Sequence, residues 1–330
     1  MGRWTIIILL TAVLVLPSVL YSFFCSDQKD SDILIDGTQT ITEYAIVNNQ
    51  NKISVMDQNS VREMVLEEYI AGVVLGEMPA EFEPEALKAQ AVASRTFTLR
   101  NVQRGHKHQN ADVCTDASCC QAYVSVDDYA GIEAHCQQVL DAVKDTEGQV
   151  ITYQGNLVEA TYFSCSGGKT EDAVAVWGTP VPYLQSVESP GEEIASVYET
   201  TTKVSVSEFM QMLGIQDVNS LKNEDIITTY TDGEGVETLQ IGSHTYSGTQ
   251  ARVLLNLRST NFTIEKVDDS IQIITRGYGH RVGMSQYGAE AMAIAGFSYE
   301  EILRHYYSGI ELVTLSQEEL DAIFDKAEKF

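Results

Sequence analysis

The chain has 330 residues, enough for one large domain or two smaller ones with full hydrophobic cores. Its 47 acidic and 21 basic residues give a formal net charge of −26. Because nucleic-acid phosphates are bound by basic surfaces, this balance argues against nucleic acid as a partner. An anionic substrate must be held by local cations, since the overall field repels it.

The first predicted element is an apolar segment from Trp4 to Phe24 that contains no charged residue. About 20 apolar residues span a bilayer as a helix. The segment offers no small-residue cleavage site, which favours an uncleaved anchor at residues 1–25 over a signal peptide. Arg3 precedes it and Asp27 follows it, so the N-terminus is expected in the cytoplasm and the rest outside. We therefore predict a single-pass protein of the cell membrane.

The exported part is predicted to begin with a polar stalk at residues 26–55. Residues 56–316 mix helical and strand patterns, which indicates an α+β fold. Within them, residues 195–270 alternate short β-rich runs with one helix and predict a β-rich lobe. A charged amphipathic helix over residues 317–330 is expected to end the chain.

A single glutamate, Glu77, follows a predicted helix over Leu66 to Gly76 and precedes another from Pro84 to about Arg104. Desolvation among apolar neighbours disfavours the charged form of a carboxyl group, and a general acid at neutral pH must be protonated. Lys88 and Arg95 share one face of the second helix and could hold an anionic or hydroxyl-rich substrate. The alternative is an ionised glutamate at a helix end with surface cations.

A cysteine- and histidine-rich segment follows the second helix. His108, Cys114 and Cys120 are spaced by five residues, and Cys119 and His106 are close by. Thiolates and an imidazole at such spacings can bind one Zn²⁺, and a thiolate-rich loop favours a structural site. The fourth ligand is left open between Cys119, His106 and water. A disulfide is the alternative in an exported domain.

A glycine-rich segment over Gly277 to Gly288 supplies further candidates. Glycines let the backbone approach a ligand, and His280, Ser285 and Gln286 bring hydrogen-bonding groups. Val282 stands where a dinucleotide-binding motif has its third glycine, so such a motif is not predicted. The alternative is a tight turn before a helix, with His280 in a structural role.

Three segments together resemble the stage II sporulation protein D (SpoIID) family, whose domain also occurs in amidase-enhancer proteins. They are Leu66 to Pro79, Leu87 to Thr96 and Gly279 to Ala289. The resemblance covers roughly residues 56–315. The last motif of the family usually reads Gly-His-Gly-x-Gly-Met-Ser-Gln, and Arg281 replaces a glycine of it here.

The resemblance implies a lytic transglycosylase that cuts peptidoglycan glycan strands during engulfment of the forespore, on the mother-cell side of the septum. The family prefers strands without stem peptides and works with a SpoIIP-like amidase and a SpoIIM-like membrane scaffold. Carried over by motif, Glu77 is the catalytic acid/base, Lys88 and Arg95 are substrate-site cations, and Tyr162 and His280 are further site residues.

The resemblance extends to the metal. The pattern of His108, Cys114 and Cys120 looks like that of clostridial members, in which it holds zinc. Two other functions stay open on the sequence. One is a non-catalytic glycan-binding activator of a cell-wall amidase, and the other is a zinc-dependent hydrolase. The second is disfavoured because catalytic zinc prefers histidine and carboxylate ligands with an open position.

Overall fold

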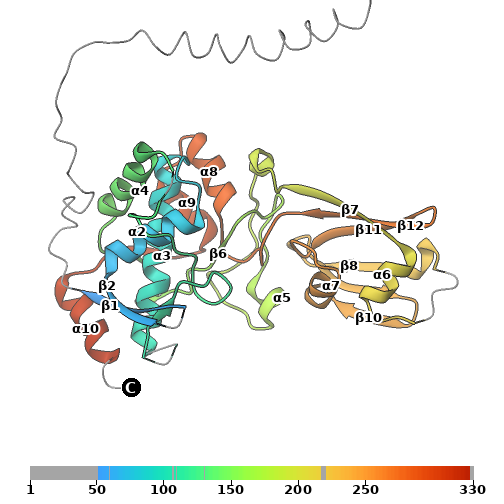
Figure 1. Cartoon of the computed structure of the whole chain (residues 1–330), viewed down its shortest axis with the longest axis horizontal. Coiled ribbons are helices and arrows are strands. Elements are labelled where there is room, and N and C mark those ends of the chain that lie inside the picture. Colours follow the sequence, from blue (N-terminus) through green and yellow to red (C-terminus); the bar gives the residue numbers. More distant parts are fainter. Residues whose placement is uncertain are drawn as a thin grey trace, which may run out of the picture. The chain divides into compact units, whose positions relative to one another are not determined.

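The structure is a computed structural model that describes residues 51–327, except 59, 106–107, 109, 130 and 217–220 (Figure 1). The described residues belong to one compact unit with the mixed helices and strands of an α+β fold. The predicted anchor and nearly all of the predicted stalk lie outside them. The first strand, β1 (Lys52–Asp57), begins where the last part of the stalk is predicted.

The described residues contain no helix that is both long and apolar enough to cross a membrane. This finding contradicts the predicted location as a single-pass protein of the cell membrane. The 21-residue helix α3 (Pro84–Arg104) has the necessary length but carries four cations along it, which a bilayer core disfavours. The segment Trp4 to Phe24, on which the prediction depends, lies outside the described residues.

The helical part is built around α3, which is buried over most of its length. Proline at its first turn suits a helix start, because the missing N–H would have no partner there. Small side chains at Ala86, Ala89, Ala91 and Ala93 let neighbouring helices pack closely. The helices packed around it are α2 (Leu66–Glu77), α4 (Glu133–Asp145), α8 (Gln286–Ile294), α9 (Tyr299–Tyr306) and α10 (Gln317–Ala327).

Short strands connect these helices. One sheet has the order β2-β1-β3 and another the order β14-β4-β5, while β6 and β13 form a parallel pair. The β6–β13 pair places Tyr162 beside Met284 and so brings the glycine-rich segment to the helical part. The bounds are β2 (Ser60–Val65), β3 (Val113–Cys114), β4 (Gln149–Tyr153), β5 (Asn156–Leu157), β6 (Tyr162–Phe163), β13 (Met284–Ser285) and β14 (Glu311–Thr314).

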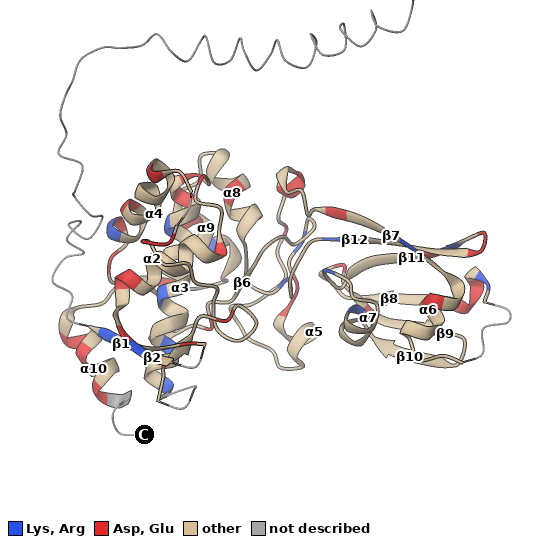
Figure 2. Cartoon of the chain, viewed as in Figure 1, with Lys and Arg blue, Asp and Glu red and all other residues tan. Residues whose placement is uncertain are grey.

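A second hydrophobic core lies in the β-rich lobe that the sequence predicts near residues 195–270. Two antiparallel sheets, β10-β9-β8 and β11-β12-β7, enclose it with two short helices. Asp and Glu are spread over both parts of the molecule, whereas Lys and Arg are sparse (Figure 2). The bounds are β7 (Glu199–Ser205), α6 (Val206–Met212), β8 (Ile226–Tyr230), β9 (Val236–Ile241), β10 (His244–Ser247), α7 (Gly248–Leu254), β11 (Asn261–Val267) and β12 (Ser270–Arg276).

Arg281 ties the two parts together. Its φ of +67° lies in the left-handed region that favours glycine, which is the residue usual at this place in the family motif. Its side chain is fully buried and donates hydrogen bonds to the carbonyls of Ser166 (2.8 Å), Lys169 (2.7 Å) and Gly233 (2.5 Å). The arginine side chain therefore links the loop after β6 to a turn of the β-rich lobe. Along the chain, α5 (Ala173–Trp177) and a short 3-10 helix (Glu192–Ile194) lie between β6 and β7, and a second 3-10 helix (Asn223–Asp225) precedes β8.

Candidate active site

A pocket of about 520 Å³ opens beside the C-terminal end of α2. The segments that form it are distant in sequence: the end of α2, the loop after the cysteines, β6 and the glycine-rich segment. Of the predicted site residues, the pocket brings together Glu77, Tyr162, His280 and Gln286. Glu77 is the one aspartate or glutamate among the described residues that line it.

Glu77 is the last residue of α2 and is partly buried. The backbone N–H of Ala122 donates a hydrogen bond to its Oε1 at 2.6 Å. Burial raises the pKa of Glu77, although the Ala122 amide and the Gln286 side chain act in the opposite direction. A Cβ at Gly76 would lie 2.7 Å from the Tyr123 nitrogen, so the absence of a side chain there lets the loop pack against the end of the helix.

Tyr162 is held at the pocket wall by a chain of hydrogen bonds. Thr98 of α3 donates to Gln121 Oε1 at 2.9 Å, and Gln121 Nε2 donates to the Tyr162 hydroxyl at 2.8 Å. Burial raises the pKa of Tyr162 well above its usual range, and the negative charge of Glu77 raises it further. The phenol therefore stays protonated near neutral pH and can donate a hydrogen bond to a ligand oxygen.

His280 lines the same pocket, and its ring lies 5.5 Å from that of Phe163 and 5.8 Å from that of Trp177, centroid to centroid. Burial lowers the pKa of His280 to about 4, and the positive charge of Arg252 contributes. The backbone N–H of Val282 donates to Nδ1 at 3.2 Å, so the proton of the neutral ring is on Nε2. His280 is thus uncharged at neutral pH and cannot serve as a general acid there.

The structure does not bring Lys88 or Arg95 to this pocket. Arg95 is fully buried and makes two hydrogen bonds of 2.8 and 2.6 Å to the Glu67 carboxylate, with further bonds to the carbonyls of Gln149 and Val143. Lys88 pairs with Glu85 at 3.1 Å and Asp145 at 3.2 Å. Both cations therefore hold α3 to its neighbours.

Ser285 is buried at the start of α8, where its hydroxyl accepts a hydrogen bond from the Gly288 N–H at 3.2 Å and caps the helix. It also donates to the fully buried carboxylate of Glu192. The same carboxylate accepts hydrogen bonds from the N–H groups of Ser166, Gly167 and Gly168. Ser285 therefore orders the glycine-rich segment, and Gln286 next to it lines the pocket.

A cluster of four side chains borders the pocket. His108, Cys114, Cys119 and Cys120 bring one ligand atom each within 4.8 Å of one another, so they could hold a metal ion. His108 Nε2 lies 3.3 Å from the Cys120 sulfur and 3.8 Å from that of Cys119. Cys119 is thus the candidate fourth ligand among the described residues, and His106 lies outside them. Cys120 itself lines the pocket.

Two pocket residues escape sequence reasoning, Gln121 and Ala122. Neither has a catalytic side chain, and Ala122 acts through its backbone N–H. The one sequence feature that could have identified them is their position directly after Cys120. If the metal cluster lies near Glu77, the residues that follow Cys120 must lie near Glu77 as well. Spacing alone could not show that the cluster and Glu77 are neighbours.

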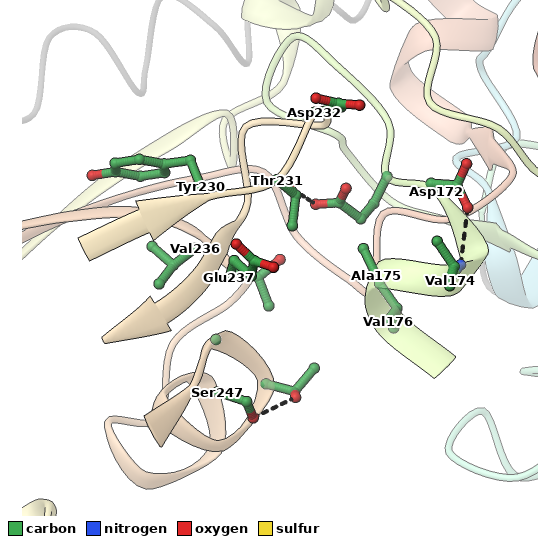
Figure 3. Close-up of a pocket in the computed structure, with 14 residues that line it drawn as sticks. Asp172, Val174, Ala175, Val176, Tyr230, Thr231, Asp232, Val236, Glu237 and Ser247 are labelled. Atoms are coloured by element: carbon green, nitrogen blue, oxygen red, sulfur yellow. Dashed lines mark hydrogen bonds between the residues drawn. The ribbon is translucent and has the colours of Figure 1, made fainter. Parts of the chain in front are cut away.

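A second pocket of about 550 Å³ lies between α5 and the β-rich lobe (Figure 3). Four carboxylates line it, those of Glu171, Asp172, Asp232 and Glu237, together with several hydroxyl groups. Glu171 is buried and accepts a hydrogen bond from Thr231 at 2.8 Å. No motif of the sequence points to this pocket.

Fold and pocket define an α+β protein whose partly buried carboxyl group lies beside a cluster of cysteine and histidine side chains. The profile of the SpoIID family, described as stage II sporulation protein, matches residues 55–153. The chain is 40% identical over 267 residues to stage II sporulation protein D of Bacillus amyloliquefaciens, which covers 77% of this chain and 76% of that protein. The corresponding protein of Bacillus subtilis (strain 168) is 38% identical over 275 residues, 81% of this chain and 78% of the relative.

A more distant relative is the amidase enhancer of Bacillus subtilis (strain 168). It is 27% identical over 304 residues, 74% of this chain and 40% of the relative. The identity and coverage of the two nearer relatives show that the chain belongs to the stage II sporulation protein D family, and they support a role in sporulation.

Proposed function

We propose that this protein is a lytic transglycosylase of peptidoglycan that acts during forespore engulfment. Its substrate would be the bond between N-acetylmuramic acid and N-acetylglucosamine in glycan strands without stem peptides. The observation that carries the proposal is Glu77, whose pKa is raised by burial and which is the one acidic side chain among the described residues lining its pocket.

One carboxyl group suffices for this chemistry. Protonated Glu77 donates its proton to the glycosidic oxygen as the bond breaks. The resulting carboxylate, which accepts the Ala122 N–H, then takes the proton of the muramyl 6-hydroxyl group. That oxygen attacks the anomeric carbon and closes a 1,6-anhydro ring. The proton count balances, and Glu77 ends protonated as it began.

Hydrolysis fits the pocket less well. Most glycoside hydrolases place two carboxyl groups on either side of the bond, one as acid and one as base or nucleophile. Among the described residues that line the pocket, Glu77 has no carboxyl partner. The neutral groups of Tyr162, His280 and Gln286 can orient sugar hydroxyl and acetamido groups without competing for the proton.

The proposal includes a structural zinc ion bound by His108, Cys114, Cys119 and Cys120. Three thiolates and one imidazole are a donor set typical of closed, structural zinc sites. With bond lengths of about 2.0–2.3 Å, a tetrahedral site separates nitrogen and sulfur ligands by about 3.6 Å. The distances of 3.3 and 3.8 Å from His108 Nε2 suit that geometry. The ion would fix the loop whose Ala122 N–H contacts Glu77.

A second function, activation of a cell-wall amidase without catalysis, is supported by the similarity to an amidase enhancer. Under it, the pocket would bind glycan and Glu77 would be dispensable. The two functions therefore differ in what the Glu77→Gln variant retains.

Mass spectrometry of soluble products tests the proposal. The purified full-length chain and its Glu77→Gln variant would each digest peptide-free glycan strands. We expect anhydro-muramyl ends from the wild type alone. Reducing ends would indicate hydrolysis and a second carboxylate. No product from either, with amidase activation by both, would favour the activator.

A further inference from the structure

The described residues that line the pocket at Glu77 include no cation that could bind an anionic glycan strand. A glycan strand without stem peptides carries a free lactyl carboxylate on each muramyl unit, and the net charge of this protein is −26. A cation is therefore needed to hold the strand. Among the described residues that line the pocket there is no lysine or arginine, and Lys88 and Arg95 are engaged elsewhere.

Arg258 of the β-rich lobe lies at the edge of the pocket. Its guanidinium carbon is 5.6 Å from the centre of the Tyr278 ring, and its carbonyl accepts the N–H of Gly279 at 3.0 Å. Both Tyr278 and Gly279 line the pocket. The side chain of Arg258 is exposed, and it makes no ion pair with any described residue. It is therefore a cation held in place by its backbone and by a ring.

Arg252, on α7 of the same lobe, brings a second positive charge to this edge. Its Nε donates to the carbonyl of Leu257 at 3.4 Å, which fixes the side chain against the loop that carries Arg258. The positive charge of Arg252 helps to lower the pKa of His280, which lines the pocket. Arg252 therefore lies near His280, and Arg258 lies near Tyr278.

Two large aromatic rings are exposed at this edge. Tyr278 is 47% exposed and Trp177 is 43% exposed, and the Trp177 ring contacts that of His280. Each side chain is only partly covered by the fold, although full burial would stabilise both. Flat, exposed rings beside hydrogen-bonding groups suit the apolar faces of pyranose sugars, which carry C–H groups on their faces and hydroxyls on their edges.

We propose a glycan-binding subsite next to Glu77 that recognises the lactyl carboxylate of the strand. It is formed by Trp177, Tyr278, Arg252 and Arg258. The rings would stack on sugar faces while a guanidinium pairs with the lactyl carboxylate of a muramyl unit. A stem peptide converts that carboxylate to an amide and removes the charge, so the subsite selects strands without peptides. The inference rests on the proposed function in that the same strand occupies both sites.

The test measures binding and not turnover. The full-length chain with Glu77→Gln serves as the parent, and its affinity is measured for peptide-free glycan strands and for the same strands with their carboxylates amidated. Arg258→Ala and Arg252→Ala are compared with Lys203→Ala, which removes one exposed positive charge from β7 of the same lobe. Lys203 does not line either pocket among the described residues.

We expect each arginine variant to weaken binding of the carboxylate strands about fivefold, a typical loss for one partly exposed charge-assisted contact. Binding of the amidated strands should change less than twofold, and Lys203→Ala should leave both unchanged. Trp177→Ala should weaken both strands about threefold, because stacking does not depend on the carboxylate.

Equal losses on both kinds of strand, no loss from either arginine, or no binding by the parent would overturn the subsite. Because the test measures binding to a parent whose cleavage is strongly slowed, these outcomes are independent of whether the wild type releases anhydro-muramyl ends. A failure of the proposed function and a failure of the subsite can therefore be told apart.

Discussion

The two pockets are similar in size, about 520 and 550 Å³, but opposite in the kind of ligand they favour. The pocket at Glu77 has one carboxyl group, whose pKa is raised, and arginines at its edge. The pocket at α5 has four carboxylates and no lysine or arginine among its described lining residues (Figure 3). An anionic strand would be repelled from the second. Charge, and not volume, therefore distinguishes the candidate active site.

Two carboxylates of the second pocket, those of Glu171 and Asp172, also have structural partners. Asp172 caps the start of α5 by accepting the Val174 N–H at 2.9 Å. Glu171 accepts a hydrogen bond from Thr231 and lies 3.5 Å from the Arg281 guanidinium. These contacts join α5 and the loop after β6 to the β-rich lobe. At Glu171, an acidic residue of this pocket thus serves to connect the parts of the molecule.

The largest expected effect is at Glu77. Glu77→Gln should lower the rate of glycan cleavage by about 10²–10⁴-fold, the usual contribution of a general acid. Asp232→Asn, in the second pocket, should change it less than twofold. Initial rates of release of anhydro-muramyl products would measure both. A comparable loss of rate from Asp232→Asn would contradict the assignment of the active site to the pocket at Glu77 alone.

The buried ion pair gives the next largest effect, on stability. Arg95→Met should lower the free energy of unfolding by about 3–5 kcal/mol, because it leaves the buried Glu67 carboxylate without its cation. Lys88→Ala should cost less than about 1 kcal/mol, since its contacts are partly exposed. Denaturant titration measures both. A large loss of turnover per folded molecule in either variant would return that residue to the site.

Removal of the proposed zinc ion should have an intermediate effect on turnover. Chelation or Cys119→Ser should lower it about tenfold, because the Ala122 N–H would lose its fixed position beside Glu77. Cys119→His, which keeps a ligand, should retain most activity. Metal content by mass spectrometry accompanies each rate. Full activity in the metal-free chain would show that the cluster is not needed to position the Ala122 N–H beside Glu77.

The smallest expected effect is on pH dependence. Burial raises the pKa of Glu77, so the protonated form needed for catalysis is lost as pH rises through that value, and turnover should fall with it. A raised carboxyl pKa also favours the folded state at low pH and loses this contribution as pH rises. The stability of Glu77→Gln relative to wild type should therefore increase from pH 4 to pH 8. Thermal unfolding at both pH values measures the difference, and a decrease would contradict the raised pKa.

Much of the fold follows from local patterns. Apolar spacing and Pro84 predict two helices, and α2 (Leu66–Glu77) and α3 (Pro84–Arg104) lie there. The α+β class also agrees with the sequence, and residues 199–276 contain two sheets around a core of their own. These features depend on neighbours a few residues apart, which a single sequence displays directly. The functions assigned to Glu77 and to the metal cluster stay predictions until they are tested.

The partners of charged residues were decided by tertiary structure. Spacing puts Lys88 and Arg95 on one face of a helix, but it cannot show that Arg95 meets Glu67 of another helix in a dry interior. Nor can spacing show that Arg258 and Tyr278 meet at the edge of the pocket, because Arg258 lies in the β-rich lobe and Tyr278 in the glycine-rich segment.

The sequence by itself determined the family motifs, the two helices around Glu77 and the candidate ligands of a metal. Only the tertiary structure decided that Ala122 contacts Glu77, that Cys119 joins the cluster, and that Arg281 has a positive φ. The reason is physical. Helix and strand patterns arise from local backbone geometry, whereas desolvation and ion pairing depend on which distant segments the folded chain brings together.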